Sequence, residues 1–192
     1  VESFFDSLKN FKIIVVDNGK NEKILERIKN FKNIQVISKN KNLGYGRAIN
    51  FAFDNVSTNF FLVLNPDLSI DVSSIENMLN TLNHYNDCGI VAPVTLPDKD
   101  FYGAFPERNL KNVDSSSAIR SRELLLDSKI EGELCVDVAK GCALLISAKH
   151  FKNIGKFDEK DFLFWEEIDL CRKFRSKKTS VIITPNSKAQ HN

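Results

Sequence analysis

Two stretches of sequence decide the fold: IIVVDNG at residues 13–19 and FFLVLNPD at residues 60–67. In each of them an apolar run is followed by an acid, Asp17 or Asp67. The apolar residues follow one another without alternation, which is typical of a strand buried on both faces of a sheet. Asparagine, glycine and proline directly after them indicate that the chain turns there. We therefore expect two buried strands, with Asp17 and Asp67 at their carboxyl ends.

Helical and strand-like segments alternate around these two stretches. Expected helices are residues 4–11, 21–31, 47–55, 72–85 and 162–174, and expected further strands are residues 33–38, 89–93, 135–138, 142–147 and 181–184. Strands that alternate with helices form a parallel sheet covered by helices. The sequence thus predicts a single α/β domain with a Rossmann-like, mostly parallel sheet. Residues 98–132 lack a sustained period, and so long a connection is commonly a functional loop.

Composition narrows the class of protein. The 192 residues include 27 Lys and Arg against 25 Asp and Glu, a net charge of +2, and 42% are hydrophobic. These are globular proportions, and a nucleic-acid-binding domain is usually far more basic. No apolar run approaches the ~18 residues of a membrane-spanning helix. The four cysteines show no CxxC pair or zinc spacing, so we expect free thiols in a reducing, cytoplasmic compartment.

The two strand-end acids form the first candidate site. Ligands bind beyond the carboxyl ends of the strands in an open parallel sheet, so Asp17 and Asp67 should face one crevice. Two carboxylates there suit Mg²⁺ or Mn²⁺ together with a nucleotide. The alternative is local, because Asp commonly caps a helix or begins a turn.

A glycine-bearing turn follows the second expected strand. The stretch NLGYGRAIN at residues 42–50 combines a tight turn, a helix start able to receive an anion, and Arg47. It lacks the GKS or GKT of a P-loop. A purely structural turn remains the alternative.

An acidic cluster lies beside the only tryptophan. Residues 165–169 read WEEID, and carboxylates next to aromatic surface can act as general bases. The alternative is a solvated helix N-terminus, where the macrodipole favours acids. The basic residues at 172–178 are either a solvated helix face or a surface for an anionic acceptor or lipid. His191 is either an exposed terminal residue or a nitrogen ligand of a metal.

Taken in order, the motifs resemble the family 2 glycosyltransferases, in particular their bacterial rhamnosyltransferase and galactofuranosyltransferase-like branch. The motifs are IIVVDNG, NLGYGRAIN, FFLVLNPD, KGCALLI, IGKFDEKDFLFWEEIDLCRKF and a trailing His. The resemblance implies a GT-A fold and an inverting, metal-dependent transfer from a nucleotide-diphosphate sugar, such as dTDP-rhamnose or a UDP-sugar. The acceptor would be a hydroxyl of a cell-surface glycan or a lipid-linked sugar, with peripheral association at the inner face of the membrane.

The resemblance also implies roles for individual residues. The donor-binding residues would be Asp17, Asn18, Asn42, Gly44, Arg47, Asn50, Asn65 and Asp67. The acceptor side would include Gly141, Cys142, Trp165 and Glu166. Glu167 would be the catalytic base with Asp169 close behind it, and Asp67 and His191 would hold Mn²⁺ or Mg²⁺. Asn65 replaces the first acid of the family's DxD motif, and many relatives carry Asp at the position of Glu167.

One departure from the family concerns the start of the chain. Family members open with a strand carrying a Tyr-Asn pair, whereas this chain begins in what should be the following helix. We therefore expect residues 1–192 to form an N-terminally incomplete transferase domain. The alternatives are a non-catalytic remnant that binds a nucleotide sugar or a partner subunit, and a nucleotidyltransferase. The glycine-rich, basic amino-terminal loop of the latter is not visible in the sequence.

Overall fold

The computed structural model describes residues 8–19, 22–28, 30–96, 132–160 and 165–191. Contacts divide the chain into two compact units, which are described separately. Unit 1 comprises residues 1–57 and 157–166, and unit 2 comprises residues 58–156 and 167–192. Within the described ranges, no helix is both long and apolar enough to span a lipid bilayer.

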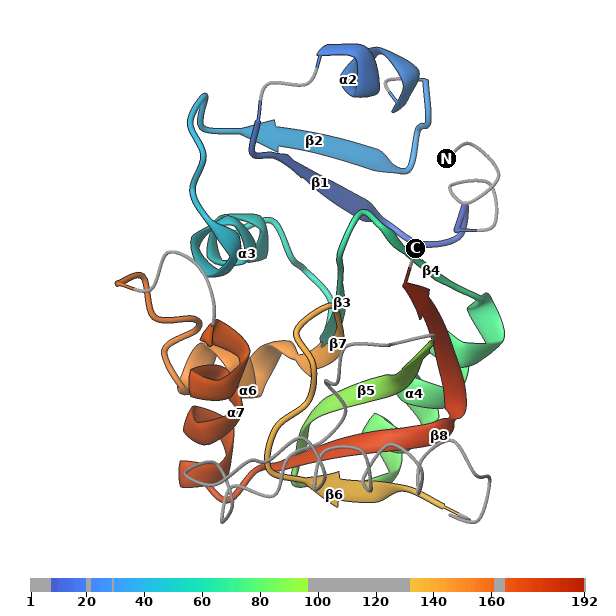
Figure 1. Cartoon of the computed structure of the whole chain (residues 1–192), viewed down its shortest axis with the longest axis vertical. Coiled ribbons are helices and arrows are strands. Elements are labelled where there is room, and N and C mark those ends of the chain that lie inside the picture. Colours follow the sequence, from blue (N-terminus) through green and yellow to red (C-terminus); the bar gives the residue numbers. More distant parts are fainter. Residues whose placement is uncertain (1–7, 20–21, 29, 97–131, 161–164, 192) are drawn as a thin grey trace. The chain divides into compact units, whose positions relative to one another are not determined.

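Unit 1 is built on a parallel pair of strands. Its elements are β1 (Ile13–Asp17), α2 (Glu22–Ile28), β2 (Ile34–Ser38) and α3 (Tyr45–Phe53). The strands pair in register from Ile13 opposite Ile34 to Asp17 opposite Ser38. Parallel strands need a crossover, and α2 supplies it (Figure 1). This register brings the carboxyl ends of both strands to the same edge, as the sequence predicts.

Unit 2 contains a larger, mixed sheet. Its strands are β3 (Phe60–Leu64), β4 (Leu68–Ile70), β5 (Cys88–Leu96), β6 (Leu134–Val136), β7 (Ala143–Ser147) and β8 (Ser180–His191). The order is β3-β7-β5-β8-β4, with β6 also paired to β8. Strand β7 is antiparallel to β3 and β5, while β5 and β8 are parallel. Hence β3, β5 and β8 run in one direction, and β4, β6 and β7 run in the other.

Helices complete unit 2. They are α4 (Val72–His84), α6 (Ala148–Asn153) and α7 (Glu166–Ser176), whose first residue belongs to unit 1. Helix α4 buries Ile75, Met78 and Leu82 and packs against β5 and β8 (Figure 1). Gly89 lets α7 approach the sheet, because a Cβ there would lie 2.2 Å from the ring of Phe174. The core therefore lies between the sheet and its helices.

The α/β elements expected from the sequence are present with shifted ends. Beyond the antiparallel direction of β7, three features differ. Strand β4 and helix α6 were not expected, and β8 continues seven residues beyond the expected end at Thr184. The extension alternates buried Ser187 and Ala189 with exposed Lys188 and Gln190. Because its buried residues are small or polar, the sequence lacks the apolar pattern by which a half-buried strand is recognised. Of the helix expected at residues 4–11, residues 4–7 lie outside the described residues, and residues 8–11 form a turn instead. The loop at 98–132 lies outside them except for its last residue.

Asp71 caps α4, which gives a first prediction. Its carboxylate accepts hydrogen bonds from the Ser74 N–H at 2.6 Å and the Ser73 hydroxyl at 2.8 Å. These bonds favour the charged form and hold the pKa of Asp71 below its usual 3.8. We expect Asp71→Ala to lower the free energy of unfolding by about 1 kcal/mol at neutral pH.

The control for this prediction is Asp71→Asn, which keeps an oxygen acceptor at the cap. Because folding lowers the pKa of Asp71, its ionic stabilisation is present above the unfolded pKa and disappears as the pH falls through the folded pKa. Urea unfolding at pH ~7 and below pH ~3 measures both effects. A gap between wild type and Asp71→Asn that widens on acidification would contradict the assignment.

Candidate active site

Asp17 lies at the edge where β1 and β2 end. The Ser38 hydroxyl donates to the Asp17 carbonyl at 3.1 Å, and the Gly19 N–H donates to Asp17 Oδ1 at 3.3 Å. The second contact is a local turn of the kind that Asp commonly begins, whereas the sequence offered a helix cap as the alternative for Asp17. It occupies one lone pair of the carboxylate, so the turn and a ligand contact are compatible. A donor contact by Asp17 stays a prediction.

Asn18 and Asn42 brace the glycine turn before α3. Asn18 Oδ1 accepts the Leu43 N–H at 2.6 Å, and its Nδ2 donates to the Gly44 carbonyl at 3.3 Å. Asn42 Oδ1 accepts the Gly44 N–H at 2.9 Å. Gly44 has a φ of 76°, a conformation that favours glycine. Within the described residues no side chain caps α3, so this helix start can receive an anionic group.

Arg47 and Asn50 hold the segment at Phe157–Glu159. Arg47 Nε donates to the Glu159 carbonyl at 2.5 Å. The buried Asn50 amide accepts the Phe157 N–H and donates to the Phe157 carbonyl, both at 3.1 Å, and its Nδ2 lies 3.3 Å from Glu159 Oε1. The side chains of both residues therefore form hydrogen bonds within the chain. Phe157 and Glu159 were not predicted, because 107 residues or more separate them from their partners.

Trp165 and Glu166 stand at the start of α7. Trp165 has a φ of 72° and is 69% exposed, which combines backbone strain with a large aromatic side chain in solvent. Glu166 is buried, and within the described part of the chain its Oε1 has no hydrogen-bond partner. Both features are compatible with the expected acceptor side, and that role stays a prediction.

In unit 2, the turn after β3 meets the end of β8. His191 Nε2 lies 3.2 Å from Asp67 Oδ2, and the neighbouring Leu68 is the sheet partner of His191. The Asn65 N–H donates to the Cys142 carbonyl at 2.9 Å, next to Gly141. One short turn thus contacts both the expected metal-binding histidine and the start of β7.

The Asp67–His191 pair has donor atoms that suit Mn²⁺ or Mg²⁺. It offers a carboxylate oxygen and an imidazole nitrogen, and the two side chains are 53% and 27% exposed. In the described residues no group of three or more His, Cys, Asp or Glu could hold a metal ion. The pair therefore fits an ion whose other ligands are diphosphate oxygens and water, which is the usual way of binding Mg²⁺.

The acids of α7 differ in their surroundings. Asp169 Oδ2 lies 2.9 Å from Lys173 Nζ, an ion pair one helical turn along. Glu167 is half-buried on the side of Cys171. Burial raises the pKa of the Cys171 thiol to about 12, and the nearby charge of Glu167 contributes to the increase. Of the two expected catalytic residues, Asp169 is therefore committed to a salt bridge.

The basic residues that follow are partly neutralised. Besides the Lys173 pair, Arg175 Nη2 lies 2.5 Å from Asp137 Oδ1. This observation supports the structural reading of the basic run for these two side chains. Every expected site residue is described, but those of unit 1 and unit 2 are placed only within their own units. That Asp17 and Asp67 face one crevice stays a prediction.

The fold of the chain is the GT-A fold of glycosyltransferases. The crystal structure of GalNAc-T7 with UDP, GalNAc and Mn²⁺ matches 94% of this chain and 37% of that chain, with a TM-score of 0.73 at 13% identity. The mannosyltransferase PcManGT from Pyrobaculum calidifontis, solved with GDP-Man and Mn²⁺, matches 99% of this chain and 52% of that chain, with a TM-score of 0.68 at 11% identity. The expected GT-A fold is confirmed.

The chain belongs to glycosyl transferase family 2, whose model matches residues 1–175. The low-salt glycan biosynthesis hexosyltransferase Agl10 of Haloferax volcanii is 28% identical over 174 residues, 88% of this chain and 54% of that protein. An N-acetylglucosaminyl-diphospho-decaprenol L-rhamnosyltransferase of Mycobacterium tuberculosis is 22% identical over 210 residues, 93% of this chain and 66% of that protein. The chain thus spans between half and two thirds of the length of these relatives.

The Asn50 contacts give a second prediction. We expect Asn50→Asp to lower the free energy of unfolding by about 1–3 kcal/mol, because the Phe157 carbonyl loses its donor and a carboxylate is placed beside Glu159. Chemical denaturation measures the loss. The neighbouring Asn55→Asp, on a half-buried residue just after α3, controls for the added charge. Unchanged stability combined with weaker nucleotide binding would instead show that Asn50 contacts the donor directly.

Proposed function

We propose that this chain is the transfer domain of an inverting glycosyltransferase that uses a nucleotide-diphosphate sugar. The observation that carries the proposal is the 3.2 Å approach of His191 to Asp67 in a family 2 chain. The two form a ligand pair at the position where the family resemblance places the metal and the diphosphate. Family membership favours sugar transfer over nucleotidyl transfer.

The donor side follows from the chemistry of these residues. Asp67 and His191 would hold Mn²⁺ or Mg²⁺, which offsets negative charge on the leaving diphosphate. The N–H groups at the start of α3 offer a second centre of positive potential for a phosphate. Asn18 and Asn42 keep that helix start in shape through their bonds to Leu43 and Gly44. Asp17 would contact the base or ribose of the nucleotide.

Glu167 is proposed as the base. It takes the proton of an acceptor hydroxyl while that oxygen attacks the anomeric carbon of the donor sugar. The bond from the anomeric carbon to the diphosphate oxygen breaks, and the nucleoside diphosphate leaves with the bonding electron pair. Because attack and departure occur on opposite faces, the anomeric configuration inverts.

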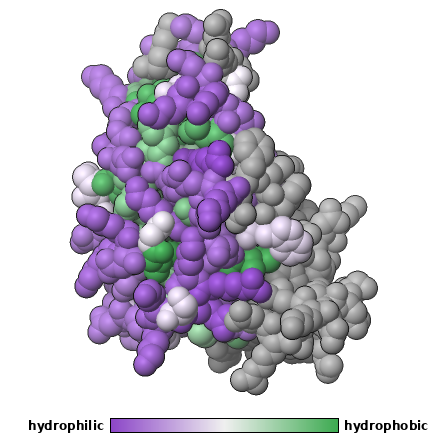
Figure 2. All heavy atoms as spheres, turned by 90° about the vertical axis from the view of Figure 1, so that its left-hand side faces the viewer, coloured by the Kyte–Doolittle hydropathy of each residue, from purple (hydrophilic) through white to green (hydrophobic). Residues whose placement is uncertain are grey.

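The substrates are proposed as classes. A dTDP-rhamnose or UDP-sugar donor and a glycan or lipid-linked acceptor agree with the relatives, one of which is named for a rhamnosyl transfer to a diphospho-decaprenol sugar. A lipid-linked acceptor implies that the enzyme acts at the cytoplasmic face of a membrane. The described residues on the face in Figure 2 are mostly hydrophilic, with hydrophobic ones in small separate spots. The described residues in this view show no broad hydrophobic patch for insertion into a bilayer.

The third prediction tests the base. With a panel of UDP-, dTDP- and GDP-sugars and Mn²⁺, we expect Glu167→Gln to slow release of the nucleoside diphosphate by at least about 100-fold, because the amide cannot accept the proton. Donor affinity, measured by calorimetry, should change little. Glu76→Gln, an exposed acid on α4, removes the same charge as a control. Equal rates in both variants would contradict the role of Glu167.

The fourth prediction tests the ligand pair. Asp67→Asn and His191→Ala should each weaken donor binding in the presence of Mn²⁺ and reduce the stabilisation that Mn²⁺ gives, because one metal ligand is removed. Thermal shift with and without Mn²⁺ reports both effects. A wild-type chain whose melting temperature responds to none of the sugars would favour the non-catalytic alternative.

A further inference from the structure

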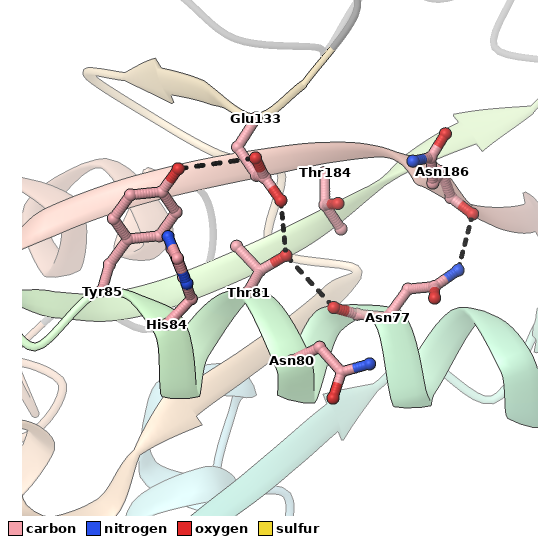
Figure 3. A pocket seen from close by; sticks show the side chains of 8 residues that line it. All are labelled: Asn77, Asn80, Thr81, His84, Tyr85, Glu133, Thr184 and Asn186. Carbon is pink, nitrogen blue, oxygen red and sulfur yellow. Dashed lines mark hydrogen bonds between the residues drawn. The ribbon is translucent and has the colours of Figure 1, made fainter.

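A polar pocket lies in unit 2 between α4, β8 and the residue before β6 (Figure 3). Its volume is about 310 Å³, at the small end of the ~300–1,000 Å³ range of ligand pockets. It forms where β8 bulges, since Pro93 of β5 pairs with Thr184 but the next residue, Val94, pairs with Lys188. The bulge moves Asn186 out of the ladder and over α4, where the Asn77 amide donates to its carbonyl at 3.1 Å.

The lining has the chemistry of a site for a neutral, hydroxyl-rich ligand. Three amide side chains, three hydroxyls, one imidazole and one carboxylate surround the space. Neither Lys nor Arg occurs among these eight lining residues, so the pocket has no partner for a phosphate or a nucleotide. Apolar contact is limited to the ring of Tyr85 and the methyl groups of two threonines.

Glu133 is oriented but loosely held. The Thr81 hydroxyl lies 3.3 Å from Glu133 Oε1, and the Tyr85 hydroxyl lies 3.5 Å from Oε2 (Figure 3). Hydrogen bonds between oxygens usually measure ~2.7–2.8 Å, so both contacts are long. A pair of adjacent ligand hydroxyls can donate to the two carboxylate oxygens at shorter distances. Hydrogen bonds to a charged acceptor are stronger than those between neutral groups. Replacing the long contacts of Thr81 and Tyr85 with shorter bonds from the ligand therefore favours binding.

The amides supply the complementary donors and acceptors. The Asn77 side-chain nitrogen donates to the Asn186 carbonyl, which leaves its side-chain oxygen as an acceptor. Asn80 is exposed, and within the described residues its side chain makes no hydrogen bond. An amide can donate and accept at once, as each sugar hydroxyl can. The set thus matches the alternating donors and acceptors around a pyranose ring.

We propose that this pocket binds one monosaccharide unit of a neutral glycan, at a site separate from the Asp67–His191 pair. His191 lies five residue steps beyond Asn186 on β8, which is about 16 Å along a strand. A glycan chain bound in this pocket would stay on the transferase while the end of the glycan lies outside the pocket. The inference rests on the pocket alone and does not require the proposed transfer reaction.

The test uses the whole chain and neutral sugars as probes. Methyl glycosides of rhamnose, galactose, mannose, glucose and N-acetylglucosamine are titrated, with ¹⁵N–¹H spectra to locate binding and saturation-transfer NMR to detect it. We expect shifts at Asn80, Glu133 and Asn186 for at least one sugar. Asn80→Ala and Glu133→Gln should each weaken that binding by about tenfold, because each loses a hydrogen bond to the ligand.

Matched controls separate this site from the transfer site. Asn83→Ala changes an exposed asparagine of the same helix outside the pocket and should leave sugar affinity unchanged. Asp67→Asn should also leave it unchanged, so failure of the transfer proposal does not affect this result. Absence of binding for all five sugars up to their solubility limit would overturn the proposal. Binding that Asn80→Ala and Glu133→Gln leave intact would overturn it equally.

Discussion

The hydrogen-bonding requirement of β8 governs the arrangement of unit 2. This strand pairs with β5 along most of its length, with β6 at its start and with β4 at its end. Buried backbone N–H and C=O groups must find partners, so each neighbour is placed by the ladder. Because β4 begins directly after Asp67, its pairing with the last residues of β8 carries His191 to that carboxylate. The contact between His191 and Asp67 is thus a consequence of sheet register.

The bulge of β8 is the second consequence of this pairing. Pro185 has no N–H to offer a ladder, and a bulge is one of the places where a sheet tolerates proline. The strand rejoins α4 through Ser187, whose hydroxyl donates to the Ser74 carbonyl at 2.8 Å, and through the Lys188 N–H, which donates to the Ser74 hydroxyl at 3.0 Å. These buried bonds fix the far side of the bulge. The part of β8 that follows Asn186 is therefore fixed to α4.

The sequence predicted the parts of the molecule that depend on apolar runs. The strands around IIVV and FLVL and the acids at their ends lie where expected, because a continuous apolar run leaves few alternatives to a buried strand. It did not predict β4 or the end of β8, because both depend on pairing with distant strands: β4 pairs with the end of β8, which also pairs with β5. The antiparallel direction of β7 was also missed, since periodicity does not encode direction.

In the candidate site, too, the sequence predicts features that depend on neighbouring residues better than those that depend on contacts between distant residues. Position along the chain suggested which polar residues belong to it, but not which of them are free to bind a ligand. The amide of Asn50 already accepts one N–H and donates to one carbonyl, and Asn18 does likewise around Gly44. An amide whose oxygen and nitrogen are both hydrogen-bonded within the chain has few hydrogen bonds left to form with a ligand. In unit 1 the proposed donor contacts are the Asp17 carboxylate and the start of α3, which no side chain caps within the described residues. Asn18 holds the backbone at Leu43 and Gly44, and Asn50 holds it at Phe157.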